Sequence, residues 1–150
     1  MKLVIQRVRQ ASVTVENEVV ARIGHGALIL IAVAVDDTPA DAHYLAGKTS
    51  RLRIFDDPTG KLNVAMDPAR GAYLVVSQFT LYGDCAKGNR PSYIQSAPPE
   101  QARTLYERYV RELKALGHRV ETGRFQEQML VELINDGPVT LLLESRGRST

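Results

Sequence analysis

The chain has 150 residues, with one cysteine and three histidines, and its 19 basic and 17 acidic side chains give a net charge of +2. A chain of this length can form one domain with a sizeable core. One cysteine excludes an internal disulfide, and three scattered histidines argue against a zinc site. The near balance of charge argues against a simple polycation. We therefore expect neither a metal nor any other cofactor.

Nothing in the sequence predicts a membrane segment or a secretion signal. The longest apolar run, residues 27–35, is far shorter than the roughly 20 residues that a membrane-spanning helix needs. Near the N-terminus, Gln6, Arg7 and Arg9 interrupt the apolar core that a signal peptide requires. We expect a cytoplasmic protein that does not associate with membranes.

Extended segments dominate the first part of the chain. Apolar and polar residues largely alternate over residues 3–15, with an irregularity at residues 9–10 that indicates a bulge. Residues 16–18 suit a tight turn, and residues 19–23 form the returning strand. Residues 27–35 are apolar on both faces and predict a central buried strand.

A helix is predicted to follow, because Thr38 can cap it, Pro39 suits its first turn and Asp41 complements its N-terminal dipole. Two short extended segments come next, at residues 53–55 and 62–64.

The second half of the chain again alternates strands and a helix. Residues 72–81 predict a mostly apolar strand, and Ser96 can cap a helix whose apolar residues follow the 3.6-residue period as far as Leu116. Gly117 then suits a left-handed helix end. Further extended segments are predicted at residues 119–125, 128–134 and 139–143.

This order of elements predicts an α+β fold in a single domain of residues 1–150. We expect a curved, mostly antiparallel sheet or partial β-barrel with two main helices packed on it. Residues 145–150 are polar and are expected to form a flexible tail.

The usual catalytic side chains give little support for a function. His25 lies in a Gly-His-Gly turn, His43 on a helix and His118 just after a helix, and we expect each to be solvated rather than catalytic. Cys85 lies in a polar loop, where an incidental small residue is the simpler interpretation.

The polar loop has a different interest, because it carries Lys87, Arg90 and Tyr93. Cations beside an aromatic ring can hold phosphates and stack a base. A nucleic-acid-binding module without catalysis is therefore an alternative, although this pattern alone is a weak signal.

Two segments are harder to explain as ordinary structure. Residues 77–80 (Ser-Gln-Phe-Thr) place polar groups on a buried strand, where they must be satisfied or face a ligand; a strand end emerging into solvent is the alternative. Residues 135–140 contain Gly137 and Pro138 between two strands. Because proline has no N–H, main-chain carbonyls can remain free there. An ordinary hairpin turn is the alternative, and the simpler interpretation of that segment alone.

With these two segments the sequence resembles the D-aminoacyl-tRNA deacylases of the type found in bacteria and eukaryotes. The signature motifs of that family are Ser-Gln-Phe-Thr and Asn-x-Gly-Pro-Val-Thr, and both are complete here. The resemblance covers about residues 1–144 in order, although Tyr93 stands where phenylalanine is common. Further matches lie at residues 6–8, 11–15, 87–88, 90–92 and 122–125, and at Met129.

The resemblance implies a homodimer with two active sites at its interface. Its substrate would be a D-amino acid esterified to the acceptor end of tRNA, and its reaction would be hydrolysis of that ester. Each site would combine Gly137 and Pro138 of one subunit, joined by a cis bond, with a catalytic segment of the other. That segment consists of Ser77, Gln78, Phe79 and Thr80.

The resemblance also implies how an L-amino acid is rejected. The carbonyls of Gly137 and Pro138 would hold the substrate ammonium, and an L side chain would then meet this rigid wall. Glycine has no side chain to clash, so glycyl-tRNA, including tRNA-Ala mischarged with glycine, should be hydrolysed too.

The remaining roles follow from the same resemblance. Main-chain N–H groups near Phe79 and Thr80 are candidate oxyanion donors, with assistance from the 2′-OH of the terminal adenosine. Phe125 and Met129 would line an adenosine pocket, and Arg7 would brace the Gly-Pro segment. A small-ester hydrolase that depends on Thr80 or Cys85 is a further alternative.

Overall fold

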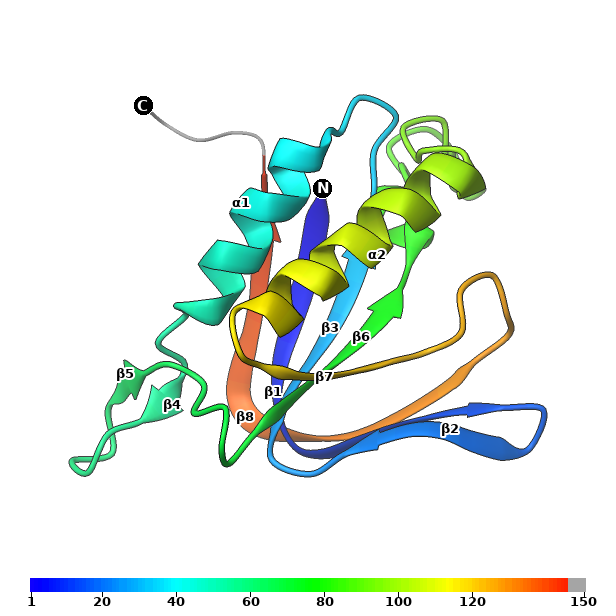
Figure 1. The fold of residues 1–150 in the computed structure, drawn as a ribbon. Helices are drawn as coiled ribbons and strands as arrows, with labels where there is room; N and C mark the ends of the chain where they lie inside the picture. Colours follow the sequence, from blue (N-terminus) through cyan, green and yellow to red (C-terminus); the bar gives the residue numbers. More distant parts are fainter. Residues whose placement is uncertain (146–150) are drawn as a thin grey trace.

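A curved mixed sheet, bent until it is nearly a barrel, carries two helices across one face in the computed structural model, which describes residues 1–145 (Figure 1). The predicted α+β fold with two main helices is thereby confirmed. In chain order the elements are β1 (Lys2–Val15), β2 (Glu18–Ile23), β3 (Gly26–Ala32), α1 (Pro39–Ser50), β4 (Phe55–Asp56), β5 (Leu62–Val64), β6 (Ala72–Ser77), the 3₁₀ helix η1 (Phe79–Tyr82), α2 (Pro99–Ala115), β7 (Arg119–Thr122) and β8 (Leu130–Glu144).

Strand β1 organises the sheet because it pairs along both edges. Its first half is antiparallel to β3 and its second half to β2, while β8 runs antiparallel along nearly its whole length. The turn into β2 places Glu16 and Asn17 in the left-handed region, with φ of 48° and 65°. Such a turn matches the twist of a hairpin. The register of β1 against β8 shifts between Val8 and Gln10, which confirms the predicted bulge.

Two pairings in the sheet are parallel, β3 with β6 and β6 with β7. Parallel neighbours need a crossover connection. Helix α1 lies on the connection from β3 to β6, and α2 lies on the connection from β6 to β7. Both helices cover the same face of the sheet (Figure 1). Because β1 is antiparallel to all three of its partners, the sheet is still mostly antiparallel, as predicted.

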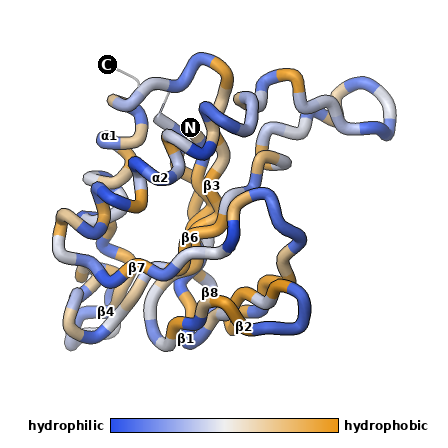
Figure 2. The backbone as a smooth tube through the Cα atoms, turned by 45° about the vertical axis from the view of Figure 1, so that its right-hand side comes forward, coloured by the Kyte–Doolittle hydropathy of each residue, from blue (hydrophilic) through white to orange (hydrophobic). Residues whose placement is uncertain are grey.

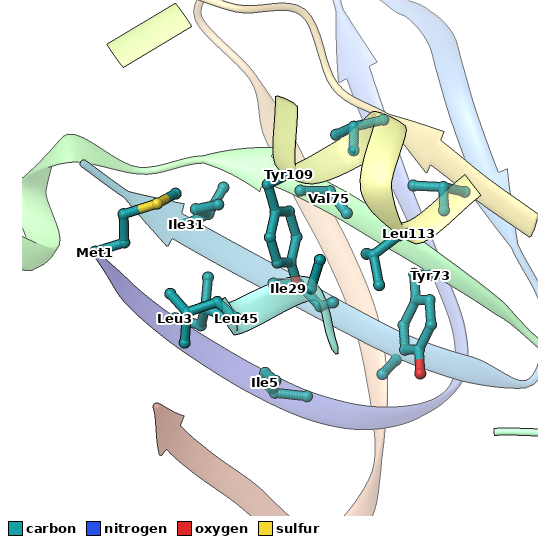
Figure 3. Packing of buried hydrophobic residues seen from close by; sticks show 14 of the residues in the cluster. Met1, Leu3, Ile5, Ile29, Ile31, Leu45, Tyr73, Val75, Tyr109 and Leu113 are labelled. Atoms are coloured by element: carbon teal, nitrogen blue, oxygen red, sulfur yellow. The ribbon is translucent and has the colours of Figure 1, made fainter. Parts of the chain in front are cut away.

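The larger core lies between the helices and the sheet. Tyr109 and Leu113 of α2 are fully buried, and they point toward Ile29 and Val75 of the parallel strands (Figure 3). Leu45 of α1 joins the same cluster. Hydrophobic segments lie along β3 and β6, and again where β1, β2 and β8 come together (Figure 2). Burial of such side chains contributes about 1.5–3 kcal/mol each.

A second apolar cluster fills the part of the curved sheet formed by β1, β2, β3 and β6. Val8, Val13, Ile23 and Leu74 are almost completely buried in it. Val131 of β8 packs against this cluster while remaining partly exposed. Because these residues come from strands far apart in sequence, the cluster fixes the curvature that brings β8 near the end of β6.

The two helices begin differently. Helix α1 begins at Pro39 as predicted, and the main-chain N–H of Thr38 donates to Oδ2 of Asp41 over 2.8 Å. The prediction that Ser96 caps α2 is wrong, because the N-cap is Pro98. The Ala97 N–H donates to Val33 O, which keeps this segment extended beside the sheet.

The C-terminal end of β8 is anchored to the start of β1. Ser145 is buried, and its N–H donates to Met1 O over 3.0 Å. The Met1 ammonium contacts Oγ of Ser145 and forms a buried ion pair with Asp37. The predicted tail therefore does not include Ser145, and residues 146–150 lie outside the described part of the chain. None of the helices in residues 1–145 is long and apolar enough to cross a membrane.

The expectation that every histidine is solvated is wrong for His118. Its ring is buried, its Nε2 forms a 2.7 Å hydrogen bond with Oγ of Ser50, and it stacks edge-on against Tyr73. Burial lowers the pKa of His118 below its usual value of 6.5, because the charged form loses hydration.

The burial of His118 predicts a pH dependence of stability. Below pH 6.5 the unfolded chain binds the proton more readily than the folded chain, so the free energy of unfolding should fall as the pH drops from 7 toward 5. Urea unfolding of wild type and His118→Gln at both pH values tests this, and the variant should lose part of the slope. His25→Gln, at an exposed position, should keep the slope. Equal slopes in wild type and His118→Gln would contradict the prediction.

Candidate functional site

The Ser-Gln-Phe-Thr segment leaves the sheet instead of continuing it. Ser77 ends β6, and the Gln78 N–H donates to Ile31 O over 2.8 Å. The prediction of a strand to residue 81 is therefore wrong. The next acceptor along that edge, Val33 O, is taken by the Ala97 N–H, and Ala34 bridges to Ser96. The chain after Gln78 therefore turns into the 3₁₀ helix η1.

The start of η1 presents unused main-chain donors. In residues 1–145, neither the Phe79 N–H nor the Thr80 N–H donates to a main-chain acceptor, as expected for the first turn of a helix. The Thr80 hydroxyl oxygen accepts a hydrogen bond from Nε2 of Gln78. An amide donor cannot remove the proton of Thr80. The segment therefore offers hydrogen-bond donors, and none of its side chains can act as a general base.

A pocket of about 730 Å³ opens beside this segment. Its walls come from the end of β6 and the first residue of η1, the entry to α2, and the chain from Phe125 to Val131. The lining residues are Val76, Ser77, Gln78, Phe79, Tyr93, Ser96, Ala97, Pro99, Ala102, Phe125, Gln126, Glu127, Gln128, Met129 and Val131.

The pocket has an apolar side that could receive a planar ring. Phe125 is half-buried, with its ring 5.7 Å from that of Tyr106, and the Arg103 guanidinium lies 4.8 Å from its centroid. Burial raises the pKa of Tyr106 to about 12, so its hydroxyl stays protonated and donates to Val75 O. On the opposite side, Oγ of Ser96 donates to Phe79 O and ties the α2 entry to η1.

The Asn-x-Gly-Pro-Val-Thr segment forms a large bulge within β8. Val8 pairs with Asn135 and Gln6 pairs with Thr140, so four residues of β8 stand opposite Arg7. The interpretation as an ordinary hairpin turn is wrong, because both halves of β8 pair with the same strand. Nδ2 of Asn135 closes the base of the bulge by donating to Arg7 O.

The tip of this bulge is exposed. Gly137 and Pro138 both face solvent, and the peptide bond between them is cis.

Arg7 holds the bulge from inside the protein. Its side chain is buried, and Nε lies 3.0 Å from Asp136 O and 3.2 Å from Oδ2 of the same residue. Nη1 donates to Ile54 O over 2.9 Å and contacts the Asp56 carboxylate at 3.3 Å. A planar guanidinium with several donors can satisfy all of these acceptors at once. The bulge is therefore tied both to β1 and to the segment around β4.

Within one chain, the bulge and the pocket are separate. Arg7 pairs with Ala27, and Ala27 pairs with Tyr73, four residues before Ser77. Three strand spacings and four residues of strand thus separate the bulge from the pocket, roughly 20 Å in all. The structure brings Ser77, Gln78 and Phe79 together with Phe125 and Met129, and Thr80 follows at the rim. It does not bring Gly137, Pro138 or Arg7 to this pocket.

Sequence reasoning missed two roles at the pocket: Ser96 lines it and links it to η1, and Gly123 lies behind the lining residue Met129. A Cβ on Gly123 would lie 2.6 Å from Sδ of Met129. The glycine inside a strand-like run was the available signal for a close approach. In residues 1–145 no cluster of three His, Cys, Asp or Glu side chains could hold a metal ion.

Comparison with solved structures defines the class of fold. A protein named "c-Myc DNA Unwinding Element Binding Protein" matches with a TM-score of 0.89 and 37% identity, over 96% of this chain and 98% of that one. A probable eukaryotic D-amino acid tRNA deacylase has the same fold, with a TM-score of 0.81 and 20% identity over 95% of this chain and 98% of that one.

Sequence comparison then identifies the family. The family model described as D-Tyr-tRNA(Tyr) deacylase matches residues 4–144. A D-aminoacyl-tRNA deacylase of Desulforamulus reducens is 56% identical over 97% of this chain and 98% of that protein. One of Halalkalibacterium halodurans is 55% identical over 97% of this chain and all of that protein. The chain therefore belongs to the D-Tyr-tRNA(Tyr) deacylase family.

The close approach at Gly123 predicts the effect of one added methyl group. In Gly123→Ala, the new Cβ should push the end of Met129 toward the pocket and lower the free energy of unfolding by about 1 kcal/mol. The ε-methyl NMR signal of Met129 should shift, while those of Met1 and Met66 should not. Gly24→Ala is the control, because its Cβ would meet nothing within 4 Å. An unshifted Met129 signal would contradict the prediction.

Proposed function

We propose that this chain hydrolyses the ester between a D-amino acid and the 3′-terminal adenosine of tRNA. Water adds to the ester carbonyl, the bond from the carbonyl carbon to the ribose oxygen breaks, and the products are the D-amino acid and free tRNA. The observation that carries the proposal is the complete Ser-Gln-Phe-Thr segment, whose two unused N–H donors lie at the rim of an apolar pocket. The names of the relatives support the same activity. The reaction would take place in the cytoplasm.

The pocket suits the two ends of this substrate. Phe125 and Met129 supply an apolar wall on which the adenine can stack. The N–H groups of Phe79 and Thr80 would receive the negative charge that develops on the carbonyl oxygen as water adds. Ser77 and Gln78 hold this turn in place at the end of the sheet.

A second copy of the chain would complete the site. Because Gly137 and Pro138 lie roughly 20 Å from the pocket of their own chain, they can meet the substrate only from another subunit. A two-fold symmetric dimer places the bulge of each chain at the pocket of the other. Arg7 would act as a positioning residue, because it holds the bulge through Asp136.

The bulge would act as a chiral filter. Main-chain carbonyls of Gly137 and Pro138 can accept hydrogen bonds from the substrate ammonium. Once the ammonium and the ester are fixed, the two enantiomers direct their side chains to different sides, and an L side chain meets the bulge. Glycine passes because it has no side chain.

The hydroxyl of Thr80 is a weak candidate for the nucleophile. Its oxygen accepts a hydrogen bond from Gln78, and no base among residues 1–145 is hydrogen-bonded to it. The 2′-OH of the terminal ribose would then assist the reaction, so the substrate itself would supply the catalytic hydroxyl that the protein lacks at this site.

One observation favours a second candidate function, a nucleic-acid-binding module without catalysis. The structural relative at 37% identity is named for binding a DNA element. Binding of this kind would fall steeply with salt and would survive changes at Gly137 and Pro138.

Three predictions test the proposed function, and the first concerns substrate selectivity. D-Tyr-tRNA and glycyl-tRNA should be hydrolysed, whereas L-Tyr-tRNA should persist at least 100-fold longer, since a clash worth about 3 kcal/mol gives that ratio. Release of labelled amino acid measures all three. Hydrolysis of both tyrosyl enantiomers, or of neither, would sink the chiral-editing proposal, and binding without hydrolysis would favour the second candidate.

The second prediction concerns Thr80. Thr80→Ala should keep kcat within about tenfold of wild type, because loss of a true nucleophile or base typically costs at least 100-fold. A substrate ending in 2′-deoxyadenosine should not be turned over. Near-complete loss of activity in a folded Thr80→Ala variant would instead make this hydroxyl the nucleophile.

The third prediction tests the shared site. Met129→Trp should block the pocket. The double variant Gly137→Ala/Pro138→Ala should lack the filter. When the two are co-expressed, half of the dimers are mixed and each has one intact site, so about a quarter of the wild-type D-selective activity should return. Each variant expressed by itself, which forms only homodimers of that variant, is the control. No recovery in isolated mixed dimers would place the whole site within one chain.

A further inference from the structure

The loop between η1 and α2 forms an ordered finger beside the pocket. Asp84 and Ser92 exchange two main-chain hydrogen bonds, of 2.8 and 2.9 Å, which close the loop like a hairpin. Oδ1 of Asp84 accepts the Ala86 N–H over 2.8 Å and forms a tight turn. Gly88 has a φ of +74° and lets the tip reverse direction. We call residues 84–92 the finger.

The finger presents two cations without compensating acids. Lys87 and Arg90 are exposed at its tip. Neither forms an ion pair with a carboxylate of residues 1–145. The one carboxylate of the finger, on Asp84, is turned toward its own backbone. The tip is therefore a positive point on a chain whose net charge is only +2.

Aromatic rings connect the finger to the pocket. Tyr93 directly follows the finger and lines the pocket, and its ring lies edge-on to Phe79, with 5.1 Å between centroids. Both rings are partly open to solvent, with exposed fractions of 54% for Phe79 and 38% for Tyr93. Proteins that bind single-stranded nucleic acid commonly place cations for the phosphates beside aromatic rings on which the bases stack.

We propose that the finger binds the phosphodiesters that precede the terminal adenosine of the substrate, through Lys87 and Arg90. This inference rests on the proposed function, because the pocket that holds the adenosine fixes where the strand must leave. A strand that leaves over Tyr93 passes toward the finger, where the two cations meet its phosphates. Contacts of this kind hold the RNA without reading its sequence.

The test compares two substrates of the same reaction. In Lys87→Ala/Arg90→Ala, the KM for D-Tyr-tRNA should rise about tenfold in dilute salt, and the slope of log KM against log salt should fall by about 1.4, or 0.7 for each lost phosphate contact. The kcat should not change. D-tyrosyl-adenosine carries no phosphate, so its hydrolysis should be equal in variant and wild type, which also confirms that the variant is folded.

Two controls separate this inference from its alternatives. Arg111→Ala/Lys114→Ala removes the same charge from the exposed face of α2, outside the pocket, and should leave both substrates unaffected. Lys87→Arg/Arg90→Lys should restore the KM. An unchanged KM for D-Tyr-tRNA, or an equal loss with both substrates, would overturn the inference.

A binding measurement keeps the inference distinct from the proposed function. The test ligand is an RNA oligonucleotide that ends in CCA and carries no amino acid. Its affinity, measured by fluorescence anisotropy, should be about tenfold lower for the Ala double variant than for wild type. If wild type hydrolyses neither substrate, the proposed function fails, while this measurement still decides the role of the finger. Equal affinities would exclude the finger as a phosphate site.

Discussion

Pairing along both edges of β1 is the constraint on which the rest of the structure depends. Because β8 must follow β1 along nearly its whole length, the extra residues of the Gly-Pro segment cannot form a turn and are pushed out of the strand. Arg7 lies opposite them, and its buried guanidinium binds Asp136. Removing that guanidinium would leave the buried Ile54 carbonyl without its donor, which typically costs about 1–3 kcal/mol, and would release Asp136 O from β1. The strand thus positions an exposed feature from within.

The pocket arises from a different constraint, the end of a parallel ladder. Because the Ala97 N–H occupies Val33 O, the chain after Gln78 finds no further acceptor along this edge and turns away. The turn leaves N–H groups of Phe79 and Thr80 without main-chain acceptors in the described part of the chain. Donors fixed in this way need no reorganisation when charge develops on a substrate. A chain with three histidines and one cysteine can therefore offer a polar site built largely from its backbone.

The sequence predicted the periodic parts of this fold well and the interruptions poorly. The alternation in β1 and the 3.6-residue period of α2 predict each element and its buried face, because burial selects the residue type at each position. The end of β6 depends instead on residues 95–97, which occupy the edge of the chain after β3, and residues 72–81 do not encode this pairing. The Gly-Pro bulge likewise depends on pairing with a strand about 130 residues away, so local turn chemistry favoured the wrong interpretation. The pocket residues were predicted by resemblance, whereas the roles of Ser96 and Gly123 depend on contacts between distant segments of the fold.

The bulge also affects the tendency of the chain to aggregate. Among the strands of residues 1–145, β8 pairs with β1 alone, so its other edge has open N–H and C=O groups over a long strand. Such an edge is a template on which foreign strands can add and aggregate. The outward step opposite Arg7 divides this edge into two short pieces, and Glu132 and Glu144 place a charge on each. The same irregularity that presents Gly137 and Pro138 therefore guards the protein against fibrillar self-association.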